Sequence, residues 1–221
     1  MFVPVFQLVK LIYKLESTGS QEVFQEELGA IFVVHRIDRQ TSGLILFAKT
    51  VVAHASLNSQ FEGRTVEKVY QAIVRGHSDR QSGIIDLPLF ENDKKGTMRV
   101  DLKHGKNSVT EFLVVEQFQG YALVEVRPKT GRLHQIRVHL AEIGLPILCD
   151  NVYGDGQAFC LSEIKPRYKM HGVEKPLLER TALHAGSLQF EHPTTHDRVQ
   201  YSAELPKGME TVLKYLRKYR G

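Results

Sequence analysis

Residues 33–50, VVHRIDRQTSGLILFAKT, carry the strongest structural signals of the chain. A charged run at His35–Arg39 leads into Thr41-Ser42-Gly43, a set of residues that favours a turn. The apolar run Leu44–Ala48 then continues without a polar residue, which is typical of a buried strand. The stretch therefore predicts a charged loop anchored directly on a buried strand.

The segments on either side of this stretch alternate between helix-like and strand-like patterns. Before it, we expect a short helix over Phe6–Leu15. After it, Thr50 can cap a helix that runs towards Phe61 and ends at Gly63. The other expected elements are a strand over Val66–Val74, hairpins and loops over Gly76–Lys106, and an antiparallel pair of Val109–Gln117 with Tyr121–Arg127, turned at Gln119-Gly120. They continue with a helix through Leu133, Ile136, Leu140 and Ile143, capped by Gly144, and a last helix with Met209, Val212, Leu213 and Leu216 on one face. Because strands and helices mix without a regular βαβ rhythm, we predict an α+β fold with a mixed, mainly antiparallel sheet and flanking helices and loops.

The composition is that of an ordinary globular protein. The chain has 221 residues, with 29 Lys and Arg against 25 Asp and Glu, and this net charge of +4 suits a polyanionic partner. The only cysteines, Cys149 and Cys160, are too few for a disulfide framework and lack zinc-site spacing, so we expect two buried thiols. No apolar stretch reaches the roughly 18 residues of a membrane span, and no signal peptide is recognisable. We therefore expect a cytoplasmic protein.

The first candidate site is the charged run itself. Asp38 lies between an apolar entry and a buried strand, with Arg36 and Arg39 on either side. Charges in such surroundings must be paired, and a neighbouring arginine keeps a carboxylate ionised. An ionised, partly desolvated carboxylate can act as a nucleophile or general base. Taken alone, however, these residues favour a structural salt bridge followed by a turn.

Two further clusters are open to more than one interpretation. In RPKTGRLHQIRVHL, residues 127–140, Arg137 follows Ile136 and could edge a cleft, and the helix N-terminus near Thr130-Gly131 offers N–H groups to a phosphate. An amphipathic helix with a solvated basic face explains this cluster equally well. Tyr70 on the predicted strand could stack on a splayed base, although an isolated strand tyrosine more often belongs to the core or its rim.

Other known motifs do not fit. The order of residues around Asp38 is wrong for a protein-kinase catalytic loop, and there is no Walker phosphate loop and no dinucleotide-binding Gly-rich motif. His134 and His139 are five residues apart, which does not match a zinc-protease helix. We therefore expect neither a metal nor a cofactor.

Together, the clusters resemble the ribosomal-large-subunit type of pseudouridine synthase in order and spacing. The resemblance runs from about residue 32 to residue 206. Four segments carry it: HRIDRQTSGLILFAKT (35–50), EKVYQAIVRG (67–76), TGRLHQIRVHLAEIGLPILCDNVYG (130–154) and LHAGSLQFEHPTT (183–195). The resemblance implies an enzyme that isomerises uridine to pseudouridine in ribosomal or transfer RNA, without cofactor or metal.

The resemblance also implies roles for single residues. Asp38 matches the nucleophile that attacks a flipped-out uridine, Tyr70 matches the tyrosine that stacks on the base and moves a proton, and Arg137 matches the arginine that pairs with the nucleophile. Ile136 matches an aliphatic residue on the other face of the base, and Arg36 matches the residue that fills the gap left by that base. Arg39, Arg132 and His134 are expected to contact RNA as well.

The chain departs from the family pattern at its start. Relatives usually carry Lys-Pro-x-Gly-Leu-x-x-His-Pro on a first strand, and residues 1–30 do not. We therefore expect a shortened N-terminal segment over 1–30, an exposed sheet edge, and a catalytic domain over 31–221. We also expect a monomer, in which the basic stretch 161–180 contacts the RNA backbone. Two alternatives are an RNA-binding protein of this fold without turnover and a hydrolase that uses Asp38.

Overall fold

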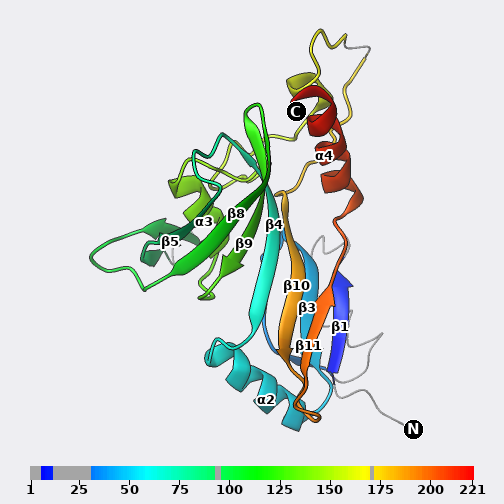
Figure 1. Ribbon diagram of the computed structural model, residues 1–221. Coiled ribbons are helices and arrows are strands. Elements are labelled where there is room, and N and C mark those ends of the chain that lie inside the picture. Colours follow the sequence, from blue (N-terminus) through cyan, green and yellow to red (C-terminus); the bar gives the residue numbers. More distant parts are fainter. Residues whose placement is uncertain (1–5, 12–30, 93–95, 170–171) are drawn as a thin grey trace. The chain divides into compact units, whose positions relative to one another are not determined.

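This computed structural model describes residues 6–11, 31–92, 96–169 and 172–221 (Figure 1). The chain divides into two compact units. The first comprises Met1–Lys68 and Ala185–Glu204, and the second comprises Val69–His184 and Leu205–Gly221. The chain therefore passes between the units three times. The expected boundary between residues 30 and 31 stays a prediction.

The first unit is built around strand β3 (Ser42–Ala48). Strand β1 (Phe6–Leu11) pairs antiparallel with β3 over six residues, and the short β2 (Phe32–Val33) pairs antiparallel with its end. Strand β10 (Leu183–Glu191) neighbours β3 in the sheet and pairs antiparallel with β11 (Arg198–Ser202). Helix α2 (Val51–Glu62) belongs to the same unit.

The predictions for β3 and α2 are confirmed. All seven residues of β3 are buried, as the continuous apolar run indicated. Thr50 accepts a hydrogen bond from the Ala53 N–H through its side chain (3.1 Å), and Gly63 is the C-cap. Leu44, Leu46 and Leu57 lie in the same buried cluster, so the helix packs on the strand.

The helix predicted over Phe6–Leu15 is wrong for residues 6–11, which form β1. Residues 12–15 of that prediction lie outside the described residues. The physical reason is tertiary: FQLVKL is short, contains β-favouring Phe and Val, and finds in β3 a strand that offers hydrogen-bonding partners along its whole length. We expected an exposed sheet edge, but at β3 that edge is covered by β1.

In the described part of the second unit, four strands lie side by side in the order β4, β9, β8 and β5. They are β4 (Glu67–Arg75), β9 (Tyr121–Pro128), β8 (Val109–Phe118) and β5 (Ser82–Asp86), and neighbouring strands are antiparallel. Strands β6 (Leu89–Asn92) and β7 (Thr97–Val100) form a separate hairpin. The helical elements are α3 (Gln135–Glu142), the 3-10 helix η1 (Leu161–Glu163) and α4 (Lys207–Tyr219). The predicted strand over 66–74, the β8–β9 pair and the α+β class are all confirmed.

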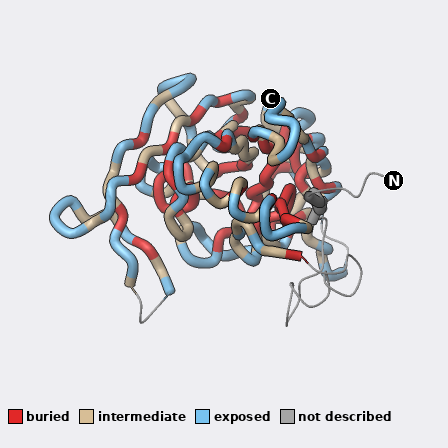
Figure 2. The backbone as a smooth tube through the Cα atoms, turned by 90° about the horizontal axis from the view of Figure 1, so that it is seen from below, coloured by how far each residue is buried: buried red, intermediate tan, exposed pale blue. Residues whose placement is uncertain are grey.

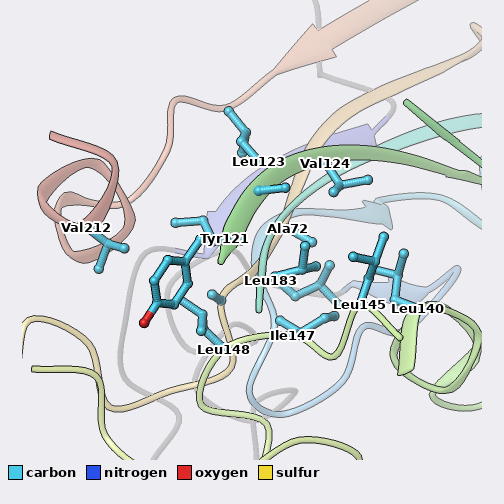
Figure 3. Close-up of a cluster of buried hydrophobic side chains, with 14 of the residues drawn as sticks. Ala72, Tyr121, Leu123, Val124, Leu140, Leu145, Ile147, Leu148, Leu183 and Val212 are labelled. Carbon is cyan, nitrogen blue, oxygen red and sulfur yellow. The ribbon is translucent and has the colours of Figure 1, made fainter. Parts of the chain in front are cut away.

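The core of this unit joins the sheet to α4 and to the segment after α3. Figure 3 shows Tyr121 and Leu148 near Val212 of α4, and Leu140, Leu145 and Ile147 beside Ala72 and Leu183. All four apolar residues predicted on one face of α4 are buried. Buried segments, red in Figure 2, recur along the backbone of both units.

Helix α3 differs from its prediction at both ends. It begins at Gln135, so Leu133 precedes it, and it ends at Glu142, so Ile143 is the C-cap. Gly144 has a φ of +77°, and the Leu145 N–H donates to the Leu140 carbonyl (2.9 Å), which closes the helix as a Schellman motif. The predicted glycine cap is therefore confirmed, one residue beyond the C-cap.

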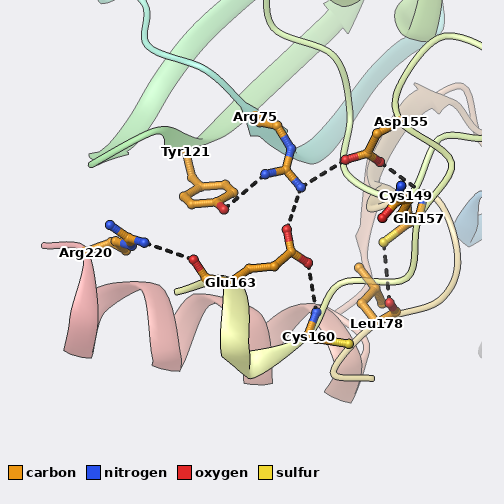
Figure 4. A network of polar contacts seen from close by, with 9 residues as sticks. All are labelled: Arg75, Tyr121, Cys149, Asp155, Gln157, Cys160, Glu163, Leu178 and Arg220. Carbon is orange, nitrogen blue, oxygen red and sulfur yellow. Dashed lines mark hydrogen bonds and ion pairs between the residues drawn. The ribbon is translucent and has the colours of Figure 1, made fainter. Parts of the chain in front are cut away.

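A polar network ties β4 to the segment 155–163 (Figure 4). Arg75 donates to Glu163 (2.8 Å) and to the Tyr121 hydroxyl (3.2 Å), and it forms an ion pair with Asp155 (3.0 Å).

Both cysteines are free thiols, as expected, but only Cys149 is buried. Cys160 is half-buried because it lies at the start of η1, near the surface.

Candidate active site

The Asp38 loop lies in the first unit and ends in a turn. The Thr41 N–H donates to the Asp38 carbonyl (2.9 Å), and Thr41 and Ser42 behind it are buried. The Asp38 side chain is half-buried, whereas Arg36 and Arg39 are exposed. The loop therefore holds its backbone rigidly while its charged side chains reach the surface.

His35 anchors this loop on β3. Its Nε2 accepts a hydrogen bond from the Leu46 N–H (3.0 Å), and its ring stacks on Phe61 of α2 (centroids 4.7 Å apart, 16° between planes). Burial, and secondarily the charge of Lys68, lowers the pKa of His35 to about 4. At neutral pH the ring is therefore uncharged and can accept this backbone hydrogen bond.

Tyr70 lies on β4 in the second unit. It is opposite Val126 of β9, and its half-buried ring packs against the main apolar core. The ring is thus held from one side by the sheet. Its contact with a base stays a prediction.

Arg137 is the most buried of the predicted site residues, with 5% of its surface exposed. Its Nε and Nη2 donate to the two oxygens of Asp150, both at 2.7 Å, and the Asp150 side chain is fully buried. The Val152 and Tyr153 N–H groups also donate to Asp150 (2.9 and 3.1 Å). Burial alone would raise the pKa of Asp150, but the hydrogen bonds from Arg137 and the backbone outweigh it, so that pKa is lowered. Both groups are consequently charged at neutral pH.

Tyr153 connects this ion pair to its surroundings. The Arg137 guanidinium carbon lies 5.1 Å from the centre of the Tyr153 ring, a cation–π distance. The Tyr153 hydroxyl accepts from the Met98 N–H of β7 (2.8 Å) and lies 2.9 Å from His134 Nδ1. His134 stands just before α3 with a φ of +49°. His134, which we predicted to contact RNA, thus lies within hydrogen-bonding distance of Tyr153 in the fold.

A buried polar network fixes the start of α3. Gln135 accepts from the Thr130 hydroxyl (2.7 Å) and donates to the Thr110 hydroxyl (3.0 Å). The same hydroxyl lies 2.8 Å from His139 Nδ1, and His139 Nε2 lies 3.0 Å from the Leu87 carbonyl. Burial lowers the pKa of His139, so this histidine is a neutral core residue and does not belong to a solvated basic face. Within the cluster at 127–140, the solvated interpretation therefore fails for Arg137 and His139.

The predicted site residues fall into groups. Arg36, Asp38 and Arg39 share the loop of the first unit, while Arg132, His134, Ile136 and Arg137 share α3 and its entry in the second. Ile136 is 7% exposed and packs in the main core, and Arg132 is half-buried. The pairing of Arg137 with Asp38 and the contact of Ile136 with a base stay predictions.

The sequence interpretation missed His35, Asp150 and Tyr153 as supporting residues. A signal for Asp150 was present, because it ends the apolar run LPILC, where a charge must find a partner. Its partner, Arg137, lies thirteen residues earlier in the chain, and no local sequence pattern indicates the pairing.

Other features of the described residues are further from this chemistry. A cavity of about 300 Å³ lies over β5, β8 and β9, lined by Ile84, Leu113 and Glu125 among others, and holds none of the predicted site residues. In the described ranges, no three His, Cys, Asp or Glu residues are grouped so that they could hold a metal. Nor is any helix in those ranges long and apolar enough to cross a membrane.

Comparisons with known proteins converge on one family. Residues 8–142 match the family described as RNA pseudouridylate synthase. The uncharacterised RNA pseudouridine synthase YlyB of Bacillus subtilis is 40% identical over 186 residues, which are 84% of this chain and 56% of that protein. Ribosomal large subunit pseudouridine synthase C of Vibrio cholerae is 38% identical over 185 residues, again 84% of this chain and 55% of that protein. The chain thus spans little more than half the length of these relatives.

Solved structures share the fold. Human RNA pseudouridylate synthase domain containing 1 superposes with a TM-score of 0.71 over 98% of this chain and 93% of that chain. Human RNA pseudouridylate synthase domain containing 4 superposes with a TM-score of 0.73 over 96% and 90%. Both are 24% identical in sequence, so the likeness concerns the fold.

Proposed function

This chain belongs to the RNA pseudouridylate synthase family, and from that premise we propose that it isomerises specific uridines in RNA to pseudouridine. The observation that carries the proposal is the extent of the family match. Residues 8–142 include Asp38, Tyr70 and Arg137, the three residues assigned to the chemistry. All three therefore fall within one continuous matched region.

In the proposed reaction, Asp38 is the nucleophile. A target uridine leaves its stack, the glycosidic bond breaks with the help of the Asp38 carboxylate, the uracil turns, and C5 joins the ribose. Tyr70 stacks on the base and moves the proton that C5 releases. Arg137 keeps the Asp38 carboxylate ionised. The half-exposed position of Asp38 and the rigid, charged state of Arg137 support these roles.

The remaining site residues are assigned to RNA binding. Arg36 takes the space vacated by the flipped base, and Arg39, Arg132 and His134 contact the surrounding RNA. Ile136 covers the face of the base opposite Tyr70. An RNA partner accounts for the net charge of +4.

We further propose a ribosomal RNA target, because the Vibrio cholerae relative at 38% identity is named ribosomal large subunit pseudouridine synthase C. We also propose that the chain acts on this target as a monomer in the cytoplasm. Comparing the pseudouridines of cellular RNA with and without the gene tests the target. A lost site in transfer RNA alone would overturn the ribosomal assignment.

The direct test of activity is tritium release from RNA labelled at uridine C5. We expect release by the wild-type chain and none by Asp38→Asn, which keeps the shape of the side chain but removes its charge. Asp197→Asn, at an exposed position of the same unit, is the matched control and should behave as wild type. Equal release by wild type and Asp38→Asn would remove Asp38 from the mechanism. Salt-dependent RNA binding by a wild-type chain that releases no tritium would favour a binding protein of this fold.

A further inference from the structure

Tyr153 touches three features of the second unit at once: the Arg137–Asp150 ion pair, His134 and the β6–β7 hairpin. We propose that it is a positioning residue with two separable actions, in which the ring orients Arg137 and the hydroxyl couples the hairpin to His134. This inference rests on the proposed function for its kinetic consequences, but not for its structural ones.

The ring acts on Arg137. Asp150 accepts from two nitrogens of the guanidinium, and the guanidinium carbon lies over the Tyr153 ring, 5.1 Å from its centre. The Tyr153 N–H also donates to the carboxylate oxygen that accepts from Arg137 Nη2. One residue therefore contacts both partners of the ion pair, and its ring keeps water from a charge that is 5% exposed.

The hydroxyl acts on a different part of the unit. It accepts from the Met98 N–H on β7, where Leu89, Met98 and Val138 form a small core between the hairpin and α3. Because a tyrosine hydroxyl has one proton and two lone pairs, it can serve Met98 and His134 Nδ1 at the same time. The hydroxyl thus links the position of the hairpin to that of His134, one of the proposed RNA contacts.

Two substitutions separate these actions. Tyr153→Phe removes the hydroxyl and keeps the ring, whereas Tyr153→Leu removes both. If the ring orients Arg137, Tyr153→Leu lowers kcat on the order of tenfold, the scale of a desolvated cation–π contact. Tyr153→Phe keeps kcat within about twofold and raises KM, because it removes the hydroxyl that links His134 to the hairpin but keeps the ring over Arg137.

Matched controls exist in the same unit. Tyr121→Phe removes a hydroxyl that accepts from Arg75, and Tyr219→Leu removes a ring beside Lys218 (5.3 Å). Both substitutions resemble those at Tyr153, but the tyrosines that they change contact other cations, Arg75 and Lys218. A general loss of packing would lower activity in the controls too, whereas the proposal predicts kcat and KM near the wild-type values for both, per folded protein.

A measurement without RNA keeps the inference separate from the proposed activity. The exchange of the Arg137 Nε–H proton with water, followed by NMR and assigned through its loss in Arg137→Lys, should be slow in wild type and Tyr153→Phe. It should be about tenfold faster in Tyr153→Leu, because the ion pair opens more often. Unchanged exchange in a folded Tyr153→Leu protein would overturn the inference even if the wild type were inactive. Accelerated exchange with no turnover by wild type would leave the positioning role standing and reject the proposed function.

Discussion

In the loop at residues 35–41, Arg36 and Arg39 are exposed and Asp38 is half-buried, whereas in the segment from α3 to Tyr153 the guanidinium of Arg137 is buried against Asp150. The loop obtains its rigidity from neutral contacts: a backbone turn and an uncharged histidine that accepts a backbone hydrogen bond. The α3 segment obtains it from a charge pair with several further donors. The side chains that we propose to reach the substrate thus keep much of their solvation, while the arginine that we propose as their support gives it up.

The largest expected effect on stability is in the α3 segment. Asp150→Asn leaves the Arg137 charge buried without its countercharge, which should lower the free energy of unfolding by about 3–5 kcal/mol. Urea unfolding measures this. Glu125→Gln, which breaks the more exposed ion pair of Glu125 with Arg127, should cost at most about 1 kcal/mol. Equal costs for the two variants would mean that the buried pair is no more important to the fold than a surface pair.

A somewhat smaller effect is expected where the loop joins β3. Gly43 has a φ of +115°, and a Cβ there would lie 2.6 Å from the Ala185 nitrogen and closer to its carbonyl oxygen. Gly43→Ala should therefore cost about 3 kcal/mol, from backbone strain and overpacking together. The control is Gly120→Ala, where φ is also positive (+78°) but no atom lies within 4 Å, so that only the strain of about 1–2 kcal/mol applies. A Gly43→Ala protein no less stable than Gly120→Ala would show that β3 and β10 can separate.

The pH dependence of stability distinguishes the two regions further. The pKa of His35 is about 4 in the folded chain, below its usual 6.5, so protons bind the unfolded chain more readily. The stabilisation is complete above about pH 6.5 and is lost as the pH falls towards about 4, with about 2 kcal/mol gone between about pH 7 and pH 5. His35→Gln should flatten the urea-midpoint profile in this range, and His77→Gln, at an exposed position, should not. A wild-type profile that the His35 substitution leaves unchanged would mean that folding does not lower the pKa of His35.

The smallest effect concerns affinity, outside both regions. Lys165, Arg167 and Lys169 belong to the stretch 161–180, where Arg167 and Lys169 are exposed. Replacing all three with Ala should weaken RNA binding and reduce the slope of log K against log salt by roughly 0.7–0.9 for each phosphate that the chain no longer neutralises. Replacing Lys207, Lys214 and Lys218 of α4 removes the same charge and should leave the slope nearly unchanged. Equal slopes in both triple variants would assign the effect to net charge.

Local patterns predicted those elements whose stability is itself local. The apolar run of β3, the Thr50 cap, the turn at Gly120 and the apolar face of α4 each lie within a few residues, and all are confirmed. The segment Phe6–Leu11 was mispredicted because its conformation depends on β3, more than thirty residues later.

The same distinction holds for the site. Asp38, Tyr70 and Arg137 could be proposed as site residues because the motifs that carry them are contiguous in sequence. Asp150 and Tyr153 were missed because they act across the fold, through Arg137 and Met98. The bounds of α3 differ from the prediction because a regular helical period does not say where the helix begins or ends.

The position of α4 has a consequence for how the chain is made. The core of the second unit includes four residues of α4: Met209, Val212, Leu213 and Leu216. The other core residues lie between Ala72 and Leu183, and the intervening segment Ala185–Glu204 belongs to the first unit. During synthesis, the second unit must therefore wait with an open apolar surface until residue 216 has left the ribosome, long after its own sheet has emerged. The first unit likewise cannot fold completely until residues 185–204 have been synthesised. A stalled or truncated chain should therefore expose apolar surface and become a substrate for chaperones and proteases.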